Sequence, residues 1–109
     1  AFNGLIIPAV ESRLKLSICY VGGLSMQAAP AEVDQISFVG RVKLPVLWLS
    51  GEYDPIFPLE QSAEPAFRHL GTPDEHKRHV VFPAGHMLPR TGRIRETLDW
   101  LDKYFGPTR

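Results

Sequence analysis

The sequence lacks several features that mark whole classes of proteins. Among its 109 residues there is one cysteine, Cys19, which excludes an intramolecular disulfide and a cysteine-based zinc site. Twelve basic and twelve acidic side chains leave no net charge, so no positive field attracts nucleic acid or an anionic membrane. The longest apolar run, residues 4–10, is broken by Pro8 and is far shorter than the roughly 20 residues of a membrane span. We therefore expect neither a nucleic-acid nor a membrane partner.

What is present is typical of a globular protein. The sequence is 44% hydrophobic and 22% charged, and a chain of this length holds one core. It opens with apolar residues, without Met and without a charged leader, which favours the interpretation that residues 1–109 are one partial domain, the C-terminal portion of something longer. With no targeting segment visible, we expect a cytoplasmic location.

Three short apolar runs predict strands. They cover residues 14–21, 44–50 and 79–82, and glycine or proline follows each of them. Continuous apolar runs are typical of strands covered on both faces, as in a parallel sheet.

Helical patterns occupy the segments between and after these runs. The clearest is residues 93–105, where apolar residues recur at steps of three and four and Gly106 ends the pattern. A second covers residues 59–70, and Pro65 within it should kink the helix or reset its start. Weaker patterns occupy residues 1–12 and 30–42. The alternation predicts an α/β fold with a three-stranded parallel sheet flanked by helices.

Two predicted strands end beside titratable side chains. Asp54 follows the strand at 44–50, and His86 follows the strand at 79–82. Because the carboxyl ends of parallel strands meet at one edge of a sheet, we expect Asp54 and His86 to lie together. A carboxylate that orients an imidazole is the acid–base part of a Ser-His-Asp triad. The alternative is that Asp54 caps its turn and His86 is a solvated loop residue.

The sequence around this pair resembles the C-terminal half of an α/β-hydrolase. The resemblance is carried by RVKLPVLWLSGEYDPIFP, by AGHMLP and by the closing amphipathic helix. Strings such as EVDQISF and RETLDWLDKYFGP are similar to a bacterial branch that includes dienelactone hydrolases and acetyl-xylan-esterase-like proteins. The resemblance implies that Asp54 is the acid and His86 the base of a catalytic triad. It also implies a small-molecule ester as substrate and no metal or other cofactor.

The nucleophile motif of that family, G-x-S-x-G, does not occur in the sequence. The nearest segment begins at Gly23 and places Ser25 correctly, but Gln27 stands where the motif has glycine. Cys19 lies within an apolar strand, where a thiol is a small hydrophobe. We therefore expect the chain to supply the acid and base of a serine esterase and to be inactive alone. Two alternatives stay open: Ser25 is an unrecognised nucleophile, or the chain is a non-catalytic binding or self-association module.

Three further expectations concern other residues. His76 and His79 lie in the charged run DEHKRH, which favours a solvated strand entrance over a metal site. Phe57 can line an acyl pocket or cover the core, and at this position it can do both. The apolar segment 1–21 includes a strand that lacks one neighbour in that family's strand order, so we expect it to mediate homo-oligomer formation.

Overall fold

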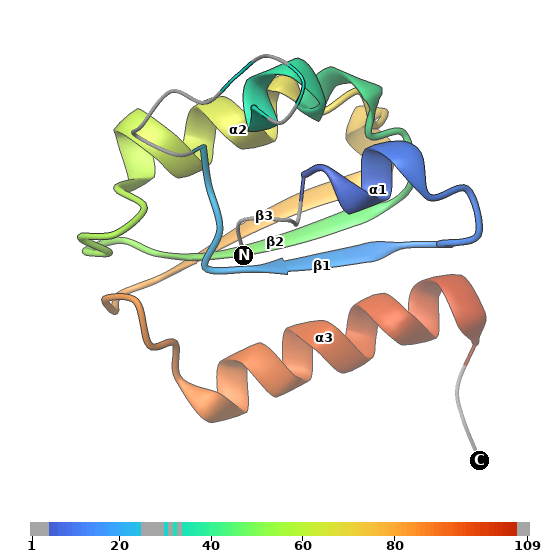
Figure 1. Cartoon of the computed structure of the whole chain (residues 1–109). Coiled ribbons are helices and arrows are strands. Elements are labelled where there is room, and N and C mark those ends of the chain that lie inside the picture. Colours follow the sequence, from blue (N-terminus) through green and yellow to red (C-terminus); the bar gives the residue numbers. More distant parts are fainter. Residues whose placement is uncertain (1–4, 25–29, 31, 33, 107–109) are drawn as a thin grey trace.

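The computed structural model describes residues 5–24, 30, 32 and 34–106 (Figure 1). Its strands form one parallel sheet in the order β1-β2-β3, with β2 in the centre. The strands are β1 (Ser17–Tyr20), β2 (Val46–Gly51) and β3 (Lys77–Phe82).

Helices cover both faces of this sheet. The α-helices are α1 (Ile7–Val10), α2 (Glu64–His69) and α3 (Arg90–Phe105). Helix α3 runs along one face, and α1 and α2 lie over the other (Figure 1). Within the described residues, no helix combines the length and apolar character needed to cross a bilayer. The predicted α/β architecture, a three-stranded parallel sheet flanked by helices, is confirmed.

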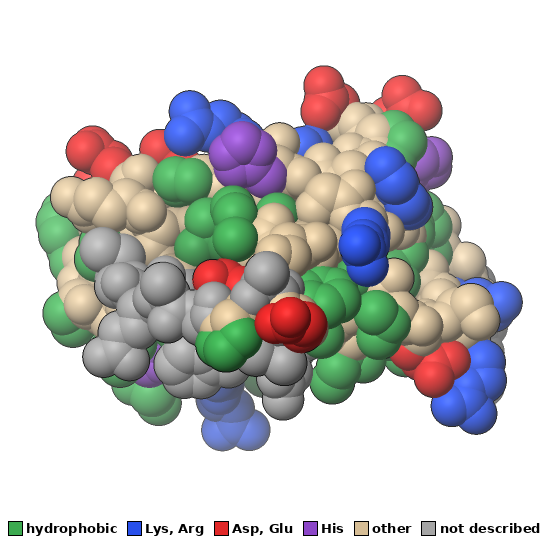
Figure 2. Space-filling view, turned by 45° about the horizontal axis from the view of Figure 1, so that its top comes forward, with side chains coloured by type: hydrophobic (Ala, Val, Ile, Leu, Met, Phe, Trp, Pro, Cys, Tyr) green, Lys and Arg blue, Asp and Glu red, His purple; other side chains and the backbone are tan. Residues whose placement is uncertain are grey.

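Strand β2 is the centre of the core because both of its faces are covered. All six of its residues are buried. Val46 and Trp48 pack in the cluster beneath α2, whereas Leu47 and Leu49 pack with Trp100 of α3. This two-sided burial explains why β2 reads as a continuous apolar run rather than an alternating one. On the face that carries α1 and α2, charges of both signs are interspersed among apolar groups (Figure 2).

Strand β1 is shorter than expected. It begins at Ser17 rather than at residue 14, since the exposed Leu14 lies outside the paired segment. It ends at Tyr20 because Val21 adopts a φ of 48°. A β-branched residue is strained in this left-handed region, so the turn out of β1 is held by its surroundings rather than by local preference.

The helices also differ in detail from their sequence patterns. The segment expected as a helix at 59–70 begins as a π-helical turn, η4 (Leu59–Ala63), and becomes α-helical only at Glu64. Pro65 stands in the first turn of α2, so the expectation that it resets the helix start is confirmed. The weak pattern at 30–42 forms two 3₁₀ turns, η2 (Gln35–Ser37) and η3 (Val39–Arg41).

Replacing Leu47 by alanine should lower the free energy of unfolding by about 2–5 kcal/mol, because the side chain is fully buried and the central strand cannot collapse around the cavity. Leu98→Ala on the exposed surface of α3 is the matched control and should change stability by less than about 1 kcal/mol. Urea unfolding followed by circular dichroism measures both. Equal losses for the two variants would contradict the assigned core.

Candidate active site

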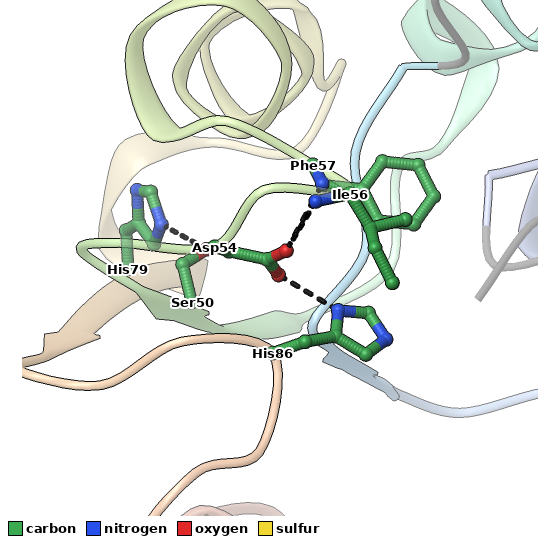
Figure 3. Close-up of polar contacts among 6 residues, drawn as sticks. All are labelled: Ser50, Asp54, Ile56, Phe57, His79 and His86. Carbon is green, nitrogen blue, oxygen red and sulfur yellow. Dashed lines mark hydrogen bonds and ion pairs between the residues drawn. The ribbon is translucent and has the colours of Figure 1, made fainter.

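The ends of β2 and β3 place an acid and a histidine against each other (Figure 3). The Nδ1 atom of His86 lies 2.9 Å from Oδ2 of Asp54. The expected contact between these two side chains is therefore present. The alternative was that Asp54 caps its turn and that His86 is a solvated loop residue. Asp54 does cap its turn, but His86 is bonded to Asp54 and is not a free loop residue.

The carboxylate of Asp54 is almost completely enclosed and fully hydrogen-bonded. Its side chain is 2% exposed. Oδ1 accepts hydrogen bonds from the backbone N–H groups of Ile56, at 2.8 Å, and Phe57, at 3.1 Å. Burial alone raises the pKa of Asp54, but the hydrogen bonds donated by His86 and by these backbone groups outweigh it and lower the pKa below its ordinary value. Asp54 is thus an ionised hydrogen-bond acceptor that is largely shielded from solvent.

This carboxylate fixes the orientation of the His86 imidazole. Because the acceptor is ionised, Nδ1–H of His86 donates to it, and in the neutral imidazole Nε2 then carries the lone pair. Within the described part of the chain, Nε2 has no hydrogen-bond partner, and the side chain is 34% exposed. The buried ring of Phe57 stacks on the imidazole, with centroids 6.3 Å apart and planes 29° apart. The result is a histidine with one nitrogen held and the other free to accept a proton.

Backbone pairing beyond the strands holds the two loops together. Glu52 N–H donates to the Phe82 carbonyl at 2.8 Å, and Tyr53 N–H donates to the Ala84 carbonyl at 3.0 Å. The pairing of β2 with β3 is thereby prolonged to the residue before Asp54. The site rests on the sheet rather than on mobile loops, which is how a precise contact is maintained.

The histidines at and within β3 make contacts that the sequence did not predict. His79 is half-buried, and its Nε2 lies 2.8 Å from Ser50 Oγ (Figure 3). Burial lowers the pKa of His79, while the charge of Glu64 opposes this effect. His76 Nδ1 lies 2.8 Å from the hydroxyl of Tyr104. His79 therefore lies within β3 and is partly buried rather than solvated, whereas His76 stays partly exposed at the entrance of the strand. Among the residues that the structure describes, no three potential metal ligands gather at one point.

The structure describes one of the two candidate nucleophiles, Cys19. Ser25 lies outside the described residues. Cys19 is 3% exposed, and burial raises the pKa of its thiol to about 12. A thiol that stays protonated and enclosed is not a nucleophile, so Cys19 is a core residue, as the sequence predicts.

Solved structures offer a comparison for this fold. The chain is similar to a cold-adapted esterase from an Arctic intertidal metagenomic library, at 25% sequence identity and a TM-score of 0.66. The likeness covers 93% of this chain but only 43% of the esterase, and the zinc-bound form of that esterase gives the same values. The chain has part of an esterase-like α/β-hydrolase fold. No protein-family model matches it, and no curated protein does.

Gly51 permits the close approach of the two loops, and its replacement by alanine should separate them. A Cβ at this position would collide with the backbone carbonyl groups of Ala84 and Gly85, whereas a Cβ at Gly85 would meet no atom within 4 Å. Gly51→Ala should therefore cost about 1–3 kcal/mol of stability and weaken the contact between Asp54 and His86. Thermal unfolding and the NMR signal of the His86 Nδ1 proton report these changes. Gly85→Ala is the control, and equal behaviour of the two variants would refute this role of Gly51.

Ionised Asp54 should make the stability of the protein depend on pH. Its folded-state pKa lies below the ordinary value of 3.8, so its stabilising contribution is present above that value and is lost as the pH falls through the folded-state pKa. The difference in unfolding free energy between wild type and Asp54→Asn should be largest above about pH 5 and shrink below about pH 4. Urea titrations at several pH values measure it, with exposed Asp99→Asn as a control of little effect. A difference that persists undiminished at about pH 3 would contradict the assignment.

Proposed function

We propose that the chain supplies the acid and base of a serine hydrolase that cleaves carboxylic esters. The observation that carries this proposal is the enclosed Asp54 carboxylate, bonded to His86 Nδ1, with Nε2 of the same imidazole left free. The likeness to a solved esterase supports it independently. Because the G-x-S-x-G motif does not occur in residues 1–109, we propose that the serine is supplied by a polypeptide segment other than these residues.

In this mechanism His86 moves the protons and Asp54 keeps the imidazole in place. Nε2 takes the proton of the serine hydroxyl as the serine oxygen bonds to the ester carbonyl carbon. The imidazolium that forms is stabilised by the adjacent carboxylate, which stays ionised because its hydrogen bonds lower its pKa. Nε2 then returns the proton to the departing alkoxide as the carbon–oxygen bond of the ester breaks. Water repeats the sequence on the acyl-serine and releases the acid.

The surroundings of His86 favour an ester with an apolar portion. Ile56 and Met87, which flank the pair on the two loops, are 54% and 78% exposed. Exposed apolar side chains held beside a proton-transfer group suit a hydrocarbon part of a substrate. We extend the proposal to small esters of the kind processed by bacterial dienelactone hydrolases and acetyl-xylan-esterase-like proteins.

A chimera with the Arctic esterase tests the proposal, because the esterase part can supply a nucleophile to Asp54 and His86. The 43% of the Arctic esterase that this chain covers would be replaced by the chain, and hydrolysis of p-nitrophenyl acetate would be measured. We expect activity that falls about 10³–10⁴-fold with His86→Gln or Asp54→Asn. Exposed His69→Gln on α2 is the matched control and should leave the rate unchanged.

Two results would overturn the proposal. The first is a folded, active chimera whose rate does not depend on His86. The second is fluorophosphonate labelling of the chain by itself that disappears with Ser25→Ala, since the nucleophile would then be Ser25 and the chain an enzyme in its own right.

A further inference from the structure

Phe57 contacts both members of the acid–base pair (Figure 3). Its backbone N–H donates to Oδ1 of Asp54 at 3.1 Å. Its ring stacks on the His86 imidazole at a centroid distance of 6.3 Å, within the range of about 4.5–7 Å that is typical of paired rings. One residue therefore touches the acid through its backbone and the base through its side chain.

The hydrogen bond to Asp54 leaves the tilt of the His86 imidazole only loosely restrained. The χ2 torsion of histidine has broad minima, so a single bond at Nδ1 is compatible with a range of ring tilts. The lone pair of Nε2 lies in the ring plane, and a tilt of the ring changes the direction in which it accepts a proton. A flat group packed against the face of the imidazole restricts this motion.

The ring of Phe57 is itself held firmly. It is 5% exposed, and this burial is supplied by the described residues without any further polypeptide. A Cβ on Gly23 would lie 3.0 Å from Cδ1 and 3.2 Å from Cβ of Phe57, so the backbone after β1 packs closely on this side chain. Pro58 follows directly and restricts the backbone of Phe57 to extended conformations. The other apolar side chains beside the pair, Ile56 and Met87, are largely exposed and are less restrained.

We propose that Phe57 is a positioning residue for the proton transfer carried out by His86. Its backbone N–H orients the acid, and its ring limits the tilt of the base, so that the Nε2 lone pair keeps one direction. The inference rests on the function proposed for His86, and it assigns Phe57 an action through the imidazole rather than on the substrate. It requires an aromatic side chain, because an aliphatic one fills the space without offering a flat face.

NMR of the histidine rings in the 109-residue chain tests the positioning without any nucleophile. Phe57→Leu and Phe57→Met keep the backbone N–H and remove the flat ring. In both variants the Nδ1 proton of His86 should exchange with solvent at least about tenfold faster, because a ring free to tilt breaks its bond to Asp54 more often. Wild-type exchange in either folded variant would overturn the proposal.

Phe67→Leu is the matched control. The Phe67 ring lies 5.0 Å from the imidazole of His79, so the same substitution acts on a different histidine. It should change the signals of His79 and leave the exchange at His86 as in wild type. An equal effect of Phe67→Leu on His86 would show a general loss of packing and would refute a specific role of Phe57.

Kinetics of the chimera with the Arctic esterase separate positioning from substrate binding. Phe57→Leu should lower kcat about tenfold and leave KM unchanged, since the alignment of Nε2 affects the proton transfer and not the binding of the ester. Phe57→Tyr keeps the ring and should retain most of the wild-type kcat. A higher KM with an unchanged kcat would make Phe57 a wall of the acyl pocket and would overturn the proposal. Unchanged exchange at His86 counts against the positioning role alone, whereas a rate independent of His86 counts against the proposed function.

Discussion

The enclosed carboxylate of Asp54 is the constraint around which the end of the sheet is organised. An ionised carboxylate with 2% exposure would be strongly destabilising without partners. Three donors meet it: two backbone N–H groups, from Ile56 and Phe57, and the imidazole of His86. Each donor requires a particular path of the chain, so the turn after β2 and the loop after β3 are specified together. The same three bonds keep the group ionised, which is what an orienting acid needs.

The parallel sheet makes this arrangement accessible to a short chain. Because β2 and β3 run in the same direction, their carboxyl ends lie at one edge, and His86 returns to Asp54 at a sequence separation of 32. Gly51 allows the last step, since only a residue without Cβ lets the backbone of the His86 loop pass so close to the end of β2. The buried core on both faces of β2 therefore holds the strand that positions Asp54. A shift of the β2–β3 register would separate Asp54 from His86.

The sequence was informative wherever local pattern and tertiary structure agree. The run 44–50 and its following turn predicted both β2 and the position of Asp54, because a strand buried on two faces must be apolar throughout. Pro65 likewise marked the start of α2. The contact of His79 with Ser50 was missed because it joins two different strands, β3 and β2. In the sequence His79 lies in the charged run DEHKRH, which indicates exposure rather than a buried contact. The end of β1 at Val21 was missed for a similar reason: tertiary contacts, not residue preference, impose its left-handed backbone.

The end of β1 and the acid–base pair are linked by contacts of the segment that leaves β1. After Tyr20 the chain turns at Val21, and the carbonyl of Leu24 accepts a hydrogen bond from Ser62 Oγ at 2.6 Å. Gly23, between them, lies against Phe57, the residue whose ring stacks on His86. The turn after β1 and the imidazole of His86 therefore share one contact residue, Phe57.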